Sequence, residues 1–280
     1  MKAFPIELDA TVTRDFQERG FVVTPDVLNG ADLARYSAAV DTEVAARTAG
    51  DERAVADKSL YEQSFVQCMR LWETNDLVRE LTCAPQLAGI ATQLLDVDGV
   101  RLWQDQALYK EAGGRETTPH QDQTFWPLGE EALISAWIPF DNVTLHNGAM
   151  SYVPGSHRAG RLKVVDITHS TDPYNILSDP ALNGAVPEPV EVSAGSVVWH
   201  HGLTVHQAAA NLSSATRRVF TIVYVSSSAR RVKGWYAYPL DRAGVAEGEL
   251  IQGEGLPVLW PPPEVLPEPP ADIGIAVGPQ

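Results

Sequence analysis

The stretch TTPHQDQ, residues 117–123, decides how this chain is interpreted. Side chains alternate between the two faces of a β-strand, so His120 and Asp122 would point to one side while Gln121 points away. His-x-Asp alone also occurs at an ordinary polar strand edge. A third ligand from a distant segment, His206, would complete a face of two histidines and one carboxylate that leaves three metal positions open, as is typical of non-haem Fe(II) and oxygen chemistry.

The composition limits the classes of partner that this chain is expected to bind. The chain has 280 residues, of which 44% are hydrophobic, enough for a well-buried core. Its formal net charge of −15 argues against nucleic acid or an anionic membrane and favours a small-molecule substrate. We expect Cys68 and Cys83 to be reduced and buried, which suits the cytoplasm, and the sequence shows neither a signal peptide nor a membrane-spanning run. The expected assembly is a monomer or a small homo-oligomer.

Residues 1–99 read as mainly helical. The spacing of apolar residues, with glycine and proline stop signals, predicts helices over 12–19, 31–48, 59–72, 76–83 and 85–95, and a short strand at 21–24. We expect these helices to buttress the part of the chain that follows.

Residues 100–227 change to short β-rich runs separated by turn residues. We predict strands over 100–109, the His120 segment, 132–140, 149–153, 161–167, 190–192, 196–206 and 217–226. Strands without intervening helices indicate a mainly β fold, a double-stranded β-helix or cupin-like jelly roll, with the N-terminal helices against one sheet. The single domain 1–280 would then comprise a helical buttress at 1–99, a catalytic core at 100–227 and a C-terminal extension at 228–280 with an extended Pro-rich tail.

Several linked segments resemble the phytanoyl-CoA dioxygenase-like family of Fe(II)- and 2-oxoglutarate-dependent oxygenases. They are GFVV at 20–23, PHQD at 119–122, AWIP at 136–139, NGAM at 147–150 with VPGSH at 153–157, and the segment 195–217. The order of these segments, together with the distal histidine and arginine, carries the resemblance.

The resemblance implies roles for individual residues. His120, Asp122 and His206 would bind Fe(II), Arg217 would anchor the distal carboxylate of 2-oxoglutarate, and the residues near that co-substrate would be Trp137, Gln121 and Gln106. A planar guanidinium can bind a carboxylate through two parallel hydrogen bonds, which lysine cannot do. Arg218 would point the other way, as a surface or sheet-bracing residue. At position 208, where relatives commonly carry a small hydroxyl residue, this chain has alanine.

The remaining histidines need separate interpretation. His146 and His169 lie in polar turns and are expected to be exposed, and His157 is expected to bond its loop to the rest of the fold. On one continuous strand His200 would lie about 20 Å from His206, so both could bind one ion only if the strand bent. We therefore keep His206 as the ligand.

The family resemblance implies an oxygenase that uses Fe(II), 2-oxoglutarate and O2 to hydroxylate, or otherwise oxidise by hydrogen abstraction, a small organic substrate, for example one of secondary metabolism. Trp126, Tyr109 and Trp235 could line the substrate pocket or merely pack the barrel mouth. Alternatives are an acyl-CoA hydroxylase of the same family, a non-oxidative cupin-type metal-binding protein, and a hydrolase with zinc on the same ligands. Asp122 argues against a halogenase, which replaces this carboxylate.

Overall fold

Two antiparallel sheets form the body of the protein. The computed structural model describes residues 6–129 and 133–278. The larger sheet has eight strands in the order β1-β8-β5-β10-β3-β2-β12, with β11 also paired to β3, and the smaller has the order β4-β9-β6-β7. The large-sheet strands are β1 Phe21–Thr24, β2 Val66–Met69, β3 Val100–Tyr109, β5 Leu133–Pro139, β8 Val197–His201, β10 Val219–Ser226, β11 Val258–Trp260 and β12 Ala276–Val277. The small-sheet strands are β4 Thr117–His120, β6 Met150–Tyr152, β7 Glu188–Val190 and β9 His206–Ala208.

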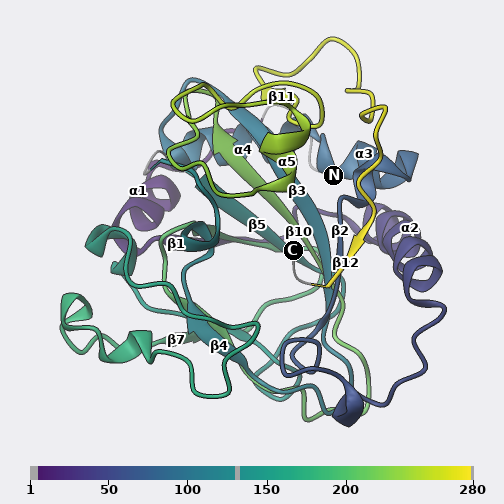
Figure 1. The fold of residues 1–280 in the computed structure, drawn as a ribbon, viewed down its shortest axis with the longest axis vertical. Helices are drawn as coiled ribbons and strands as arrows, with labels where there is room; N and C mark the ends of the chain where they lie inside the picture. The colour runs from purple at the N-terminus through teal and green to yellow at the C-terminus, as the bar shows by residue number, and fades with distance from the viewer. Residues whose placement is uncertain (1–5, 130–132, 279–280) are drawn as a thin grey trace.

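Helices cover the outside of the large sheet, which confirms the predicted helix-buttressed jelly roll (Figure 1). They are α1 Ala10–Arg19, α2 Gly30–Thr48, α3 Asp76–Thr82 and α4 Pro85–Leu95, whereas the short α5 Tyr238–Arg242 packs on the other face, where Leu240 joins Val223 and Val225. Pro85 begins α4 at a position where no backbone N–H is needed, and almost the whole helix is buried against β3, β5 and β10. None of the described helices has the length and apolar character that crossing a membrane requires.

The predicted helix over 59–72 is wrong. Residues 66–69 form β2, which pairs antiparallel with β3, and a 3-10 helix, Leu71–Glu73, follows. Arg70 separates the two in a left-handed conformation, with φ of 57°. The apolar residues of this segment satisfy a helical period locally, but pairing with β3 buries them in the sheet, so tertiary context prevails over the local pattern.

The predicted strand over 161–167 is also wrong, because this segment is irregular. Arg161 anchors this segment, because its guanidinium donates to the carbonyl oxygens of Gln123 and Leu128, each at 2.7 Å. The segment therefore lies beside the residues that follow β4 without joining a sheet.

The predicted strand over 196–206 is broken in two. β8 ends at His201, and β9 begins at His206 in the other sheet. Gly202 starts the turn between them, where a Cβ atom would come within 2.5 Å of Leu133, so no larger residue fits. This bend places the rings of His200 and His206 only 4.7 Å apart between centroids.

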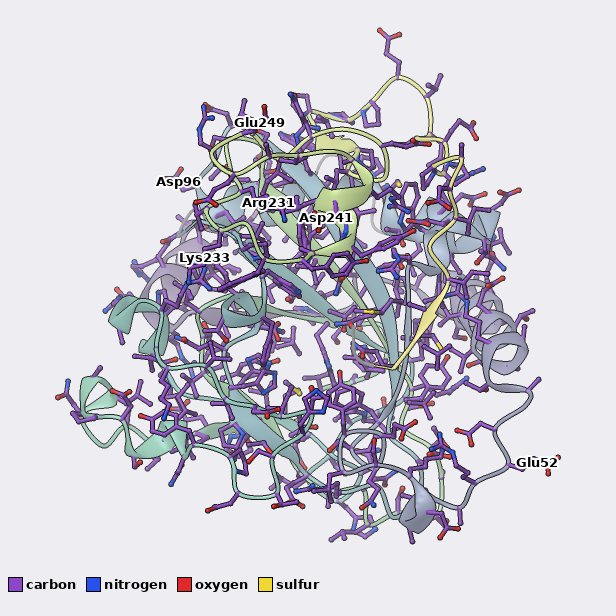
Figure 2. The ribbon with its side chains drawn as sticks, in the orientation of Figure 1. Glu52, Asp96, Arg231, Lys233, Asp241 and Glu249 are labelled. Carbon is purple, nitrogen blue, oxygen red and sulfur yellow. The ribbon has the colours of Figure 1, made fainter. Side chains whose placement is uncertain are left out.

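The C-terminal extension contains α5, and its two short strands join the large sheet (Figure 1). β11 pairs with β3 and β12 pairs with β2. Within the extension the buried Arg231 pairs with Asp241 of α5 at 3.1 Å (Figure 2). The extension thereby holds the outer side of β2, whose residues Gln67 and Met69 line the cavity described below.

Candidate metal centre

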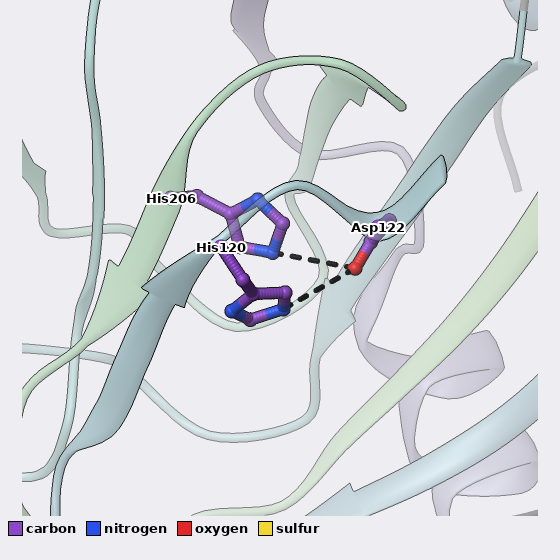
Figure 3. A group of neighbouring side chains, drawn as sticks. All are labelled: His120, Asp122 and His206. Carbon is purple, nitrogen blue, oxygen red and sulfur yellow. Dashed lines mark ion pairs between the residues drawn. The ribbon is translucent and has the colours of Figure 1, made fainter. Parts of the chain in front are cut away.

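The side chains of His120 and Asp122 meet that of the distant His206 between the sheets (Figure 3). β4 pairs with β9 so that His120 lies opposite His206. Asp122 Oδ1 lies 3.4 Å from Nε2 of His120 and 3.5 Å from Nε2 of His206. One ligand atom from each residue falls within 4.8 Å of the other two, which is the geometry of a common metal site.

Both ligand histidines are oriented by the backbone. Nδ1 of His120 lies 2.7 Å from the carbonyl oxygen of Thr118, and Nδ1 of His206 lies 2.9 Å from that of Thr204. Each Nδ1–H therefore donates to a carbonyl, which leaves the Nε2 lone pair free for a metal. Burial lowers the pKa of His206 to about 3, so this imidazole is neutral at physiological pH, as a metal ligand must be.

Two side chains orient the Asp122 carboxylate through one of its oxygens. Its Oδ2 atom accepts hydrogen bonds from Ser135 Oγ and His200 Nε2, both at 3.2 Å, so that Oδ1 faces the two ligand histidines. Burial acts to raise the pKa of Asp122, but the neighbouring histidines, His206 first, outweigh it and hold that pKa well below the usual value. Two neutral nitrogens and one carboxylate oxygen, oriented in advance and open on one side, fit Fe(II).

Replacing His200 by alanine should weaken metal binding by about tenfold while leaving one site per chain, because outer partners orient a ligand without binding the metal themselves. Mn(II) binding followed by electron paramagnetic resonance measures both quantities. The exposed His169, replaced by alanine, is the control. A stoichiometry that falls to zero for His200→Ala at saturating Mn(II) would make His200 a ligand.

The triad opens into a cavity of about 240 Å³. Of the residues singled out from the sequence, those that line it are His120, Asp122, His206, Arg217, Trp137, Gln106 and Trp126. The lining also includes His200, which the sequence analysis set aside as a ligand, and residues given no role there, among them Gln104, Thr117, Met150 and Thr221. Polar residues at alternate positions of an apolar strand, Gln104 and Gln106, were the sequence signal for this wall.

Arg217 lies at the wall of the cavity with unused hydrogen-bonding capacity. It is 3% exposed, its Nη1 donates to the Gly148 carbonyl at 2.7 Å, and its Nε has no partner among the described residues. Its guanidinium carbon lies 5.2 Å from the ring centre of Trp137. Burial lowers the pKa of Arg217 to about 10, so the group remains a cation at neutral pH. No described carboxylate forms an ion pair with it, so an anion from outside the chain can do so.

The adjacent arginine is used differently. Arg218 pairs with Asp141 at 2.6 Å and with Asp41 at 2.7 Å, outside the cavity lining. In β-structure consecutive side chains point to opposite sides, which separates these two arginines as the sequence implies.

Three of the residues singled out from the sequence are not in the cavity lining. Gln121 is fully buried on the other side, where its side-chain amide bonds to the backbone of Gly160, Leu162 and Leu203. Tyr109 packs in the helix-side core, and its hydroxyl donates to Asp41 at 2.6 Å. Trp235 is 41% exposed.

Ala208 lies beside a hydroxyl that comes from another strand. Across the pairing of β4 with β9 it faces Thr117, which lines the cavity. The Nζ of the fully buried Lys110 lies 3.4 Å from Thr117 Oγ1. Burial first, then the charge of Arg217, lower the pKa of Lys110 to about 7.

Comparison with known proteins points in one direction. A family model described as phytanoyl-CoA dioxygenase (PhyH) matches residues 16–219. Phytanoyl-CoA dioxygenase domain-containing protein 1 of Danio rerio is 32% identical over 158 residues, 54% of this chain and 53% of that protein. Phytanoyl-CoA dioxygenase of Arabidopsis thaliana is 28% identical over 170 residues, 56% of this chain and 55% of that protein. The matched stretches thus span about half the length of these relatives.

Solved structures match over more of the chain. The non-haem alpha-ketoglutarate-dependent carbocyclase SnoK from nogalamycin biosynthesis superimposes with a TM-score of 0.72 and 29% identity, covering 90% of this chain and 96% of that one. The non-haem alpha-ketoglutarate-dependent epimerase SnoN from the same biosynthesis gives 0.72 and 25%, covering 89% and 97%.

Proposed function

We propose, because this chain belongs to the phytanoyl-CoA dioxygenase family, that it is an Fe(II)- and 2-oxoglutarate-dependent dioxygenase that oxidises a small organic molecule by hydrogen abstraction. The observation that carries this proposal is one cavity lined both by the His-Asp-His triad and by a buried arginine that has no carboxylate partner among the described residues. A non-oxidative metal-binding protein would have no use for that arginine. SnoK and SnoN, an alpha-ketoglutarate-dependent carbocyclase and epimerase, support the same class of chemistry.

His120, Asp122 and His206 would hold the iron, and Arg217 would hold the distal carboxylate of 2-oxoglutarate with the Trp137 ring beside it. When bound, iron and 2-oxoglutarate supply an oxidant from O2, with succinate and carbon dioxide as by-products. The role of the chain is to position the metal ligands and the substrate. Ser135 and His200 fix the Asp122 carboxylate, and the cavity walls would exclude water and orient the substrate. Gln121 has no role in this proposal, because its side-chain amide is hydrogen-bonded to the backbone outside the cavity.

The proposed compartment is the cytoplasm, and the proposed partner is a small molecule. Cys68 and Cys83 are both free and buried, and burial raises the pKa of Cys68 to about 11 and that of Cys83 to about 12, so both thiols are protonated and unreactive at neutral pH. The acidic net charge of −15 supports a small molecule in preference to nucleic acid.

The acyl-CoA alternative needs a basic surface for the phosphates of coenzyme A, and the compact candidate is only partly available. Arg231 is buried with Asp241 (Figure 2). Arg230 and Lys233 are exposed, but Arg230 donates to the Gly248 carbonyl at 2.8 Å and Lys233 lies over the Trp235 ring at 4.3 Å. Arg217 is the only lysine or arginine among the described residues that line the cavity. An uncharged substrate is therefore favoured.

Succinate release should accordingly be greater with uncharged ring compounds than with acyl-CoA esters. The acidic surface repels a polyanion, and any local attraction of such an ester would weaken with added salt. Succinate is measured with each compound, Fe(II) and 2-oxoglutarate at low and moderate ionic strength, with an oxygen-free control. Efficient and strongly salt-sensitive turnover of an acyl-CoA ester that is lost in Arg230→Ala would reverse the choice of substrate.

A further inference from the structure

The floor of the cavity presents uncharged hydrogen-bonding groups that no described residue satisfies. Gln104 lines the cavity, is 4% exposed, and has no hydrogen bond from its carboxamide to any described residue. Thr221 also lines it, is 3% exposed, and its Oγ1 has no partner in the described chain. A buried polar group left without a partner, such as the Thr221 hydroxyl, costs about 1–3 kcal/mol. The Gln104 carboxamide opens onto the same cavity, so a molecule bound there can supply partners for both groups.

Strand alternation places Gln104 on the cavity side of β3, together with Gln106 two positions later. In the pairing of β3 with β10, Val223 faces Gln104 but Tyr224 faces Leu102, so Trp103 is the extra residue of a β-bulge. The bulge changes the side for the residues before it, so Leu102 packs in the helix-side core although it is two positions from Gln104.

Strand register places Gln104 level with the metal centre. Across the large sheet Gln104 is in one row with Val223, Ser135 and His200. Ser135 and His200 are the residues that hold Oδ2 of Asp122. The adjacent row contains Gln106, Thr221 and Trp137 and lies nearer Arg217 along β10. The free carboxamide therefore faces the space beside the metal ligands.

A relay of side chains orients the next amide. The hydroxyl of Tyr61 donates to Gln67 Oε1 at 2.7 Å, and Gln67 Nε2 donates to Gln106 Oε1 at 2.6 Å. This use of its oxygen leaves the NH2 group of Gln106 as the donor available to the cavity. All three side chains line the cavity.

Aromatic side chains form another part of the wall. Phe125 and Trp126 come three and four residues after Asp122 in the chain, and both line the cavity. Trp126 packs on Trp103 with ring centroids 5.6 Å apart, which fixes its plane. Fixed aromatic faces bind flat apolar surface, while isolated amide and hydroxyl groups select oxygens at its edge.

We propose that the substrate is an uncharged ring compound that carries hydroxyl or carbonyl oxygens, and that Gln104 and Thr221 select it by hydrogen bonds to those oxygens. This inference rests on the proposed function, since it places the ring beside the metal centre. A carbonyl oxygen would accept from the Gln104 amide or the Thr221 hydroxyl, and a substrate hydroxyl would donate to the oxygen of either. An alkyl chain, which carries no oxygens, would leave both the Gln104 amide and the Thr221 hydroxyl unsatisfied.

Binding of three matched probes to the chain loaded with Mn(II) and 2-oxoglutarate tests this inference without turnover. Tetralin, 1-tetralone and 1-tetralol share one ring system and differ in one oxygen. By calorimetry the two oxygenated probes should bind about tenfold more tightly than tetralin, equivalent to about 1.4 kcal/mol. Gln104→Leu and Thr221→Val should each reduce that preference by threefold or more without weakening tetralin, and Thr221→Ser should retain it.

Each remaining outcome counts against the substrate class. It is overturned if tetralin binds as tightly as the oxygenated probes, if both Gln104→Leu and Thr221→Val keep the full preference, or if none of the three compounds binds. Failure of the proposed function looks different. In that case Fe(II) and 2-oxoglutarate yield no oxygen-dependent succinate with any compound, even where the binding preference is present.

Discussion

Asp122→Ala should bind metal at least 100-fold more weakly than the parent chain and should release no substrate-dependent succinate. The substitution leaves a dication with two neutral imidazoles and removes the one anionic ligand. Mn(II) affinity by electron paramagnetic resonance and succinate formation with Fe(II) measure the two effects. Asp141→Ala removes a carboxylate that pairs with Arg218 outside the cavity, and it should change neither.

His200 could partly replace the lost carboxylate, so a second variant is needed. Its Nε2 lies 3.2 Å from Asp122 Oδ2, and its ring lies 4.7 Å from that of His206, so it could approach a metal once the carboxylate is gone. The double variant Asp122→Ala with His200→Ala removes that possibility. Full turnover by Asp122→Ala, or unchanged metal affinity in the double variant, would show that the triad is wrongly assigned.

Arg217→Lys should weaken 2-oxoglutarate binding by roughly 30- to 1000-fold, which corresponds to about 2–4 kcal/mol for a bidentate charge-assisted pair out of water. Lysine keeps the charge but offers no planar pair of donors. Its ammonium would also be buried at a site where Arg217 is 3% exposed. Calorimetric titration of 2-oxoglutarate into Mn(II)-loaded chains measures the loss.

Arg218→Lys is the matched control from the next position. Arg218 forms partly exposed ion pairs with Asp41 and Asp141, and such pairs contribute about 0–1 kcal/mol, so 2-oxoglutarate affinity should stay within roughly fivefold. Equal affinities for the two variants would mean that another group holds the distal carboxylate.

The meeting of the three ligands could be predicted from the sequence, although the local structure differs from the expectation. β4 ends at His120, and Asp122 begins the 3-10 helix Asp122–Phe125. Gln121 remains extended, with φ of −115° and ψ of 127°, so the alternation of sides still holds across it. The pattern was sufficient because it needed only one extended residue between the two ligands.

Other features depend on contacts that a local pattern does not contain. β2 forms because β3 lies beside it, and β12 forms from a Pro-rich tail because the edge of β2 is available. His200 reaches Asp122 because the chain turns at Gly202, which crosses from one sheet to the other. Leu102 packs in the helix-side core, on the other side from Gln104, because of a bulge whose position only the register of β3 with β10 defines.

The most direct test of the account is an anaerobic titration of the metal-free chain, first with Fe(II) and then with 2-oxoglutarate, followed by admission of air. For a 2-oxoglutarate-dependent oxygenase we expect one Fe(II) per chain and 2-oxoglutarate binding that depends on that metal and on Arg217. Succinate should form only after oxygen enters. If 2-oxoglutarate binds no better with Fe(II) than without it, or if Zn(II) supports hydrolysis of a substrate in the absence of oxygen, the cavity is not that of a 2-oxoglutarate-dependent oxygenase.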